Sequence, residues 1–233
     1  MALTLGLFNR LRTGKGMYID FSIIEGAMTL LGPHFLDFEV NQRRTRRGDF
    51  PPGNRSLFPP LAPHNTYRCL GRDRLGQGNW VFIACETDVQ FKALSHLMER
   101  PEIASDARFA TNENRVKNQD ALDEIIQEWT TPQSRYEIMD LCQKAGIIAG
   151  AMQTGEDRVE FDPQLRKRGV FPVVPHAYLG DNKVEAYPVR LSKTSAAIRR
   201  GAPLWREHNR YVFGDLLGLS TEDMVLLEAD GVI

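Results

Sequence analysis

The sequence predicts a mixed α/β protein, and three observations support this prediction. Segments whose apolar residues recur at helical spacing alternate with short apolar runs typical of strands. Hydrophobic residues make up 42% of the chain and charged residues 25%, which is ordinary for a soluble globular protein. With 233 residues, the chain can bury one sizeable core or form up to about two domains.

Charge and cysteine content argue against several classes of protein. The formal net charge is −1, from 29 basic and 30 acidic residues, so no overall field attracts the chain to nucleic acid or to an anionic membrane. No stretch approaches the ~18 to 20 apolar residues that a membrane span needs. The three cysteines are widely spaced and lack a CxxC pair, which favours neither a disulfide framework nor a zinc knuckle and fits a reducing cytoplasm.

The N-terminal part predicts a helix, a strand and further helix. The start MALTLGLFNRLR has its basic residues after the apolar run, which favours the end of an amphipathic or buried helix over a signal peptide. Gly14 is the expected left-handed stop of that helix. Residues 18–22 alternate like a strand, and residues 23–40 have helical spacing with Gly32 and Pro33 as a stop or kink.

Composition changes between residues 41 and 65. This stretch holds five prolines and five arginines without a sustained period, so it is expected to be a long loop or an interdomain linker. Four of the arginines form a dense basic cluster: Arg43, Arg44, Arg46 and Arg47. Guanidinium groups match the phosphate oxygens of a phosphorylated cofactor, but a solvated loop or an interchain salt-bridge site is the favoured interpretation.

The central part is predicted as one compact unit built on a small sheet. Residues 66–70 and 80–85 are expected to form a hairpin, followed by a helix over 88–98. A second helix is expected over 112–129, with one apolar face formed by Leu122, Ile125, Ile126 and Trp129. Thr131 followed by Pro132 predicts the start of a third helix, which ends at Gly146.

The C-terminal part is predicted to be extended and then helical. Strands are expected over 170–178 and 183–191, after a short helix in the phrase DPQLRKRG. A helix over 207–217 would be closed by Gly218. Residues 220–223 resemble a capping box that opens the last helix.

The residues by themselves form no complete catalytic constellation. The sequence has no GxSxG, P-loop or GxGxxG motif, and its histidines never have the i, i+4 spacing of zinc ligands, so no metal site is predicted. Cys85 stands beside Glu86, whose charge would raise the thiol pKa, so a buried structural cysteine is favoured over a nucleophile. Glu207 and His208 at a helix start favour a capping or packing role.

An ordered set of phrases runs from about residue 3 to the last residue. The phrases are RTGKGMYIDFSIIEGA, GN at 53–54, AP at 62–63 before YRC, WVFIAC, DARFATNENRVKN, AGIIAGAMQT, DPQLRKRG, PVRLS, APLWREHN, and LLGLS with the closing GVI. Taken in this order, they resemble the family III CoA-transferases, the group that includes formyl-CoA and carnitine CoA-transferases.

The resemblance implies an arrangement of domains. It implies an α/β fold in which a Rossmann-like large domain is built from both ends of the chain, a small α+β domain is inserted between them, and two chains interlock as a dimer. Residues 1–40 would end the first large-domain segment, and residues 41–65 would be the linker. Residues 66–178 would form the small domain, and residues 179–233 would return to the large domain.

The resemblance also implies a reaction, the transfer of CoA between an acyl-CoA and a small carboxylic acid, with a CoA thioester as substrate and no metal. The family's aspartate nucleophile attacks the acyl-CoA to give a mixed anhydride and then an enzyme thioester. That aspartate would lie in a segment before Met1, so no catalytic residue is assigned and an incomplete chain is expected. Asp20 follows the TGKG phrase and lies elsewhere.

Site and partner expectations follow from the same resemblance. Gly53, Asn54 and Arg55 match a glycine run of formyl-CoA transferase and are the expected substrate-binding residues, without its flexible lid. Arg206 stands where the family usually has glycine. The expected partner is an N-terminal-half polypeptide or a second copy of this chain. Two alternatives stay open: an acyl-CoA racemase or isomerase, and a non-catalytic remnant that assembles or binds CoA esters.

Overall fold

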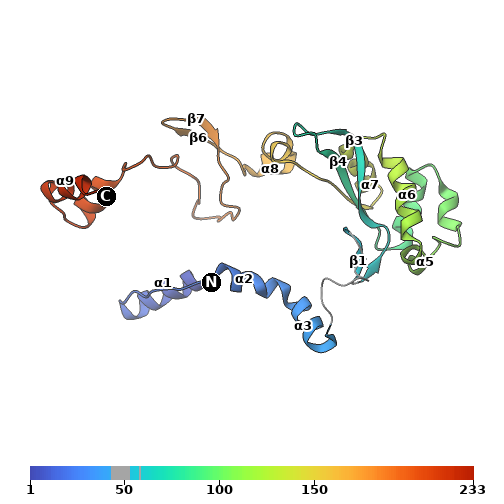
Figure 1. Cartoon of the computed structure of the whole chain (residues 1–233), viewed down its shortest axis with the longest axis horizontal. Helices are drawn as coiled ribbons and strands as arrows, with labels where there is room; N and C mark the ends of the chain where they lie inside the picture. The colour runs from blue at the N-terminus through green and yellow to red at the C-terminus, as the bar shows by residue number, and fades with distance from the viewer. Residues whose placement is uncertain (43–52, 58) are drawn as a thin grey trace.

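The computed structural model describes residues 1–42, 53–57 and 59–233. Figure 1 shows a compact unit of strands and helices, with the N-terminal helices and the C-terminal segments extending away from it. The arginine cluster predicted at 43–47 lies outside the described residues. No helix in the described part of the chain is long and apolar enough to cross a membrane.

The N-terminal part is helical throughout, apart from one irregular stretch. Its elements are α1 (Ala2–Thr13), α2 (Ile23–Met28), the 3-10 turn η1 (Thr29–Leu31) and α3 (Gly32–Asn41). Gly14 ends α1 at φ 71°, and its N–H donates to the Arg10 carbonyl, so the predicted stop is confirmed. The helical break at Gly32 is confirmed as well. The strand predicted over 18–22 is wrong, because this stretch is irregular and its last residue, Ser22, caps α2.

A three-stranded antiparallel sheet forms the base of the compact unit. Its strands are β3 (His64–Arg72), β4 (Gly78–Ala84) and β5 (Ile148–Ala151), in the order β3-β4-β5. The predicted hairpin is therefore confirmed, with Tyr67 opposite Val81 and Arg68 opposite Trp80. A shorter hairpin, β1 (Ser56–Leu57) with β2 (Pro60–Leu61), precedes the sheet.

Helices cover one face of this sheet. They are α4 (Asp88–Leu97), the 3-10 segment η2 (Pro101–Ser105), α5 (Asn112–Lys117), α6 (Gln119–Thr130) and α7 (Arg135–Lys144). The core between sheet and helices includes Tyr67, Cys69, Val81, Ile83, Phe91, Leu94, Leu122, Ile126, Ile138 and Cys142. The predicted apolar face of α6 is confirmed, since Leu122 and Ile126 are fully buried while Ile125 and Trp129 pack against the core.

Two helix boundaries differ from the prediction. The helix expected over 112–129 is divided at Asn118, which has a non-helical backbone and donates its side-chain amide to the Asn114 and Arg108 carbonyls. The third helix begins at Arg135 with Ser134 as its cap, not at Thr131. Thr131 instead completes the last turn of α6, because both its N–H and its hydroxyl donate to the Gln127 carbonyl.

The C-terminal part consists of short elements. They are η3 (Asp157–Phe161), α8 (Pro163–Arg168), β6 (Val173–His176), β7 (Gly180–Lys183), η4 (Arg210–Leu216) and α9 (Thr221–Ala229). The short helix in DPQLRKRG and the capping box of α9 are confirmed. The strand predicted over 183–191 is wrong, because Gly180 at φ 68° turns the chain early and β7, which pairs with β6, ends at Lys183. The domain boundaries at 40, 65 and 178 stay predictions.

A buried arginine joins four segments of the compact unit. Arg115 of α5 is inaccessible to solvent and donates to the Ala62 carbonyl at 2.7 Å, the Phe109 carbonyl at 3.0 Å and Asp88 Oδ1 at 2.7 Å. Its guanidinium carbon lies 4.4 Å from the centroid of the Phe91 ring. A buried cation is tolerated only when its donors are satisfied, so this residue fixes the chain around it.

We expect Arg115→Met to lower the free energy of unfolding by ~3 kcal/mol, because it leaves two carbonyls without their donor. Urea unfolding followed by circular dichroism measures this change. Arg100→Met is the matched control, since Arg100 is 45% exposed and pairs with Glu102 at the surface, and a change within ~0.5 kcal/mol is expected. Equal effects of the two substitutions would contradict the structural role of Arg115.

The three cysteines are free and buried, and burial raises the thiol pKa to about 11 for Cys69 and about 12 for Cys85 and Cys142. We expect a disulfide-exchange thiol reagent at pH 8 to label all three only after unfolding. Unfolded thiols also ionise at lower pH than folded ones, so stability should fall as the pH rises above ~9. Rapid labelling of Cys85 in the folded chain would contradict its assignment as a structural cysteine.

Candidate functional site

The three residues expected to bind substrate form a turn against the start of β3. Gly53 has φ 70°, a left-handed conformation that favours glycine. The Asn54 side chain donates to the Thr66 hydroxyl at 3.0 Å, and the backbone carbonyl oxygen of Asn54 contacts Nδ1 of the His64 side chain. The turn is therefore held to the strand by side chains, and the substrate-binding role of its residues stays a prediction.

Arg55, the third residue of this turn, is held by two carboxylates of α6. Its Nη2 lies 2.6 Å from Asp123 Oδ2 and 2.6 Å from Asp120 Oδ1. Asp123 also accepts from Asn65 Nδ2 at 3.0 Å and from the Tyr67 hydroxyl at 2.7 Å. We call Arg55, Asn65, Tyr67 and Asp123 the Asp123 cluster.

Burial and charge perturb two members of the Asp123 cluster. Burial is the main cause that raises the pKa of Tyr67 well above its usual range, and the Asp123 charge raises it further. Burial lowers the pKa of Arg55, but its bonds to Asp123 and Asp120 outweigh this and leave it raised. Because two carboxylates already neutralise Arg55, its charge is poorly available to an anionic substrate.

Sequence reasoning missed the other members of the Asp123 cluster. The signal was a polar stripe on α6, where Asp120, Asp123, Gln127 and Thr130 recur every three or four residues beside the apolar face. Gln127 uses both ends of its amide on β3, accepting from the Arg68 N–H at 2.9 Å and donating to the Arg68 carbonyl at 2.9 Å. The stripe thus provides hydrogen-bond partners for backbone groups at the edge of β3 that no neighbouring strand pairs.

The sheet face opposite the helices is exposed. By strand alternation it carries Thr66, Arg68 and Leu70 of β3, Trp80 and Phe82 of β4, and Ile148 and Gly150 of β5, which we call the outer sheet face. Leu70 is 59% exposed, and Trp80 and Ile148 are 40% exposed. A hollow of about 560 Å³ at its edge is lined by residues that include Arg68, Arg72, Trp80 and Gln127.

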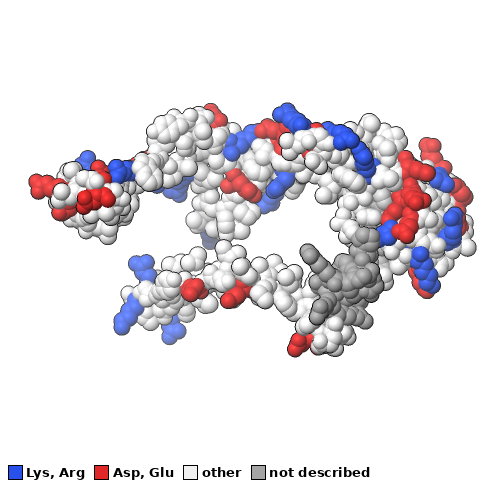
Figure 2. Space-filling model, viewed as in Figure 1, with Lys and Arg blue, Asp and Glu red and all other residues white. Residues whose placement is uncertain are grey.

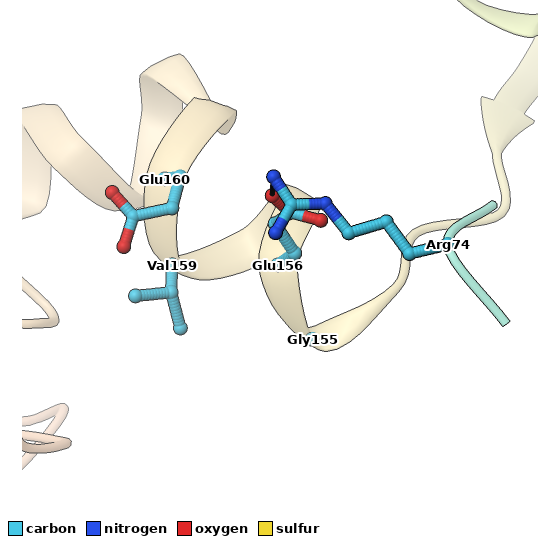
Figure 3. A pocket seen from close by; sticks show the side chains of 5 residues that line it. All are labelled: Arg74, Gly155, Glu156, Val159 and Glu160. Atoms are coloured by element: carbon cyan, nitrogen blue, oxygen red, sulfur yellow. Dashed lines mark ion pairs between the residues drawn. The ribbon is translucent and has the colours of Figure 1, made fainter.

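A second hollow, of about 540 Å³, lies between the β3–β4 turn and η3 (Figure 3). Arg74 spans it and pairs with Glu156 at 2.7 Å. Glu160 also lines it, so its two carboxylates outnumber its one cation. This balance disfavours an anionic ligand.

A third hollow, of about 190 Å³, holds the Glu207–His208 pair in the C-terminal part. Glu207 Oε2 accepts from the Leu204 N–H at 2.6 Å within the turn that precedes η4. The N-cap residue of η4 is Asn209, so Glu207 does not cap the start of this helix as predicted. His208 Nε2 lies 3.2 Å from Nη1 of Arg200. No group of three or more histidine, cysteine, aspartate or glutamate side chains in the described ranges could hold a metal ion.

The chain resembles known proteins over nearly its whole length. CoA-transferase family III matches residues 1–209. The succinyl-CoA–D-citramalate CoA-transferase of Chloroflexus aurantiacus is 30% identical over 98% of this chain and 54% of that protein. The formyl-CoA:oxalate CoA-transferase of Streptomyces avermitilis is 30% identical over 97% of this chain and 56% of that protein.

The fold has solved relatives as well. A CAIB/BAIF family protein from Brucella suis superposes with a TM-score of 0.76 at 29% identity, over 92% of this chain and 52% of that protein. The predicted α/β fold is therefore confirmed, and the chain spans about half the length of the curated relatives it matches. With the family matching residues 1–209, the chain belongs to CoA-transferase family III.

Proposed function

We propose that this chain is the C-terminal portion of a CoA-transferase that moves CoA between an acyl-CoA and a small carboxylic acid. The observation that carries this proposal is the match to CoA-transferases over 98% of the chain. Their names specify CoA transfer and, in the citramalate and malate enzymes, succinyl-CoA as one substrate. The proposed place for the acyl group is the outer sheet face, and the Asn54–Thr66 bond that attaches the Gly53–Arg55 turn to its end supports this.

The acceptor in this proposal is a small dicarboxylic acid. Citramalate, malate and oxalate, which appear in the names of the relatives, each carry two carboxyl groups. Only one carboxyl group forms the thioester in CoA transfer. The other stays anionic throughout the reaction and needs a donor or a cation in the site.

The catalytic carboxylate is proposed to lie outside these 233 residues, to which we assign no nucleophile. The proposed partner is an N-terminal-half polypeptide or a second copy of this chain. Support comes from α1, whose Leu3, Leu5 and Phe8 are 75%, 59% and 56% exposed. Figure 2 shows mostly uncharged surface along the N-terminal helices, and large apolar patches of this kind mark protein interfaces.

The partner is tested by co-purification and turnover. We expect the chain, expressed in its native host background, to elute with a second polypeptide and to transfer CoA from succinyl-CoA to malate or citramalate. Leu5→Glu with Phe8→Glu should abolish the complex, because charges cannot be buried in an apolar interface. Glu25→Lys on α2 is the control, since it changes the charge of these helices at an exposed site. A homogeneous 26.4 kDa monomer without turnover would support the non-catalytic alternative instead.

A substitution in the Asp123 cluster tests whether the Gly53–Arg55 turn contacts the substrate. We expect Asp123→Asn to lower the free energy of unfolding by ~1–3 kcal/mol and to raise the KM for acyl-CoA severalfold, since Arg55 keeps only its bond to the exposed Asp120. Asp120→Asn removes a carboxylate that is 88% exposed and should change little. If Asp123→Asn altered stability but left KM unchanged, the turn would not contact substrate.

A further inference from the structure

Two hydrogen-bond donors of the outer sheet face, the Arg68 guanidinium and the Trp80 indole N–H, lie close together above Gly78. Arg68 of β3 and Trp80 of β4 lie directly opposite each other in the strand register. A Cβ atom placed on Gly78 would lie 3.4 Å from Arg68 Nε and 3.5 Å from Trp80 Nε1. The guanidinium and the indole N–H therefore border the same small volume, which the absence of a side chain at Gly78 leaves open.

Neither donor has an acceptor within the described residues. The Arg68 backbone is bonded to Gln127 and Thr130, but its guanidinium makes no hydrogen bond or ion pair in the described part of the chain, and neither does the indole N–H of Trp80. By contrast, Arg55, Arg115 and Arg135 each pair with a carboxylate. Arg68 is thus a cation placed on the sheet without a structural partner.

The surroundings of this pair favour an anion. The hollow of about 560 Å³ is lined by Arg68 and Arg72 and by no carboxylate. Arg72 is tied to its own hairpin, donating to the Gly76 carbonyl at 2.8 Å, and the Gln127 amide is occupied by β3. The ligand that fits is small and anionic, with an apolar part to lie against the half-exposed Trp80 ring.

We propose that Arg68 and Trp80 bind the free carboxylate of a dicarboxylic acyl group or acceptor. The two N–H donors would each meet one carboxylate oxygen, and the guanidinium supplies the charge. This inference rests on the proposed CoA transfer, and it names the residues that select dicarboxylic over monocarboxylic acids. Arg55 is a poorer candidate because Asp120 and Asp123 already neutralise it.

The pair shares one sheet face with a residue that contacts the expected substrate-binding turn. Thr66 and Arg68 are two residues apart on β3, so their side chains share the outer sheet face. Thr66 accepts from Asn54 of the Gly53–Arg55 turn. A dicarboxylate held by Arg68 and Trp80 over Gly78 therefore lies on the same sheet face as Thr66, toward the β3–β4 turn and away from the Gly53–Arg55 turn.

The experiment is a ligand-observed NMR titration of the purified chain, with any co-purifying polypeptide, at constant ionic strength. Succinate and butyrate serve as probes because they have equal chain length and differ by one carboxylate. We expect succinate to bind more tightly than butyrate. Arg68→Met should weaken succinate binding roughly tenfold, and Trp80→Phe, which keeps an aromatic ring but removes the N–H, should weaken it severalfold.

Arg108→Met is the matched control, because Arg108 is also a surface arginine but is paired with Asp106 at 2.6 Å. It should bind succinate as the unchanged chain does. Equal affinity for succinate and butyrate, or an Arg68→Met chain that retains full succinate affinity, overturns the inference. Binding is read without turnover, so selective succinate binding in a complex with the co-purifying polypeptide that transfers no CoA would overturn the proposed function and leave the Arg68 site standing.

Discussion

Helix α6 is bonded to strand β3 through a row of polar side chains, and the candidate site depends on this contact. The Asp123 carboxylate accepts hydrogen bonds from the side chains of Tyr67 and Asn65. The Gln127 amide bonds to both the N–H and the carbonyl of the Arg68 backbone, and the Thr130 hydroxyl donates to the same carbonyl. An edge strand normally exposes its backbone groups to solvent or to other chains. Here the helix satisfies them, fixes the register of the strand and anchors the preceding turn through Arg55.

The arginines of the compact unit divide by their partners. Arg115 is fully buried and bridges two carbonyls and Asp88, while Arg135 joins Asp157 and the Met152 carbonyl at the end of β5. These residues hold segments together, because removing such an arginine leaves buried polar groups without a hydrogen-bond partner. The guanidinium of Arg68 has no such partner in the described part of the chain, which is why Arg68 is the arginine proposed to bind a carboxylate.

The two ends of the chain differ from the compact unit in how they bury their apolar residues. Helices α2 and α3 have no buried residue and α1 buries only Gly6, although all three are rich in apolar side chains. The compact unit, in contrast, closes a continuous core between its sheet and helices. The compact unit is therefore stabilised by its own core, whereas the N-terminal helices bury almost no apolar side chains against the described part of the chain.

The sequence by itself determined the local elements and the family. Helix ends and buried helix faces depend on patterns only a few residues long, so they could be predicted. Examples are the helix ends at Gly14 and Ser220 and the apolar spacing of Leu122 and Ile126. The strand predictions over 18–22 and 183–191 were wrong because a strand needs a neighbouring strand to pair with, and a sequence pattern alone does not supply one.

The site was decided by the tertiary structure. Gly53, Asn54 and Arg55 were proposed from the resemblance, but the bonds of Asn54 to Thr66 and of Arg55 to Asp123 span 12 and 68 positions of sequence. The sequence does not show that Arg55 is paired with two carboxylates while the guanidinium of Arg68 has no partner among the described residues. This difference depends on which carboxylates the packing of α6 on β3 brings within reach, and that is a property of the folded chain alone.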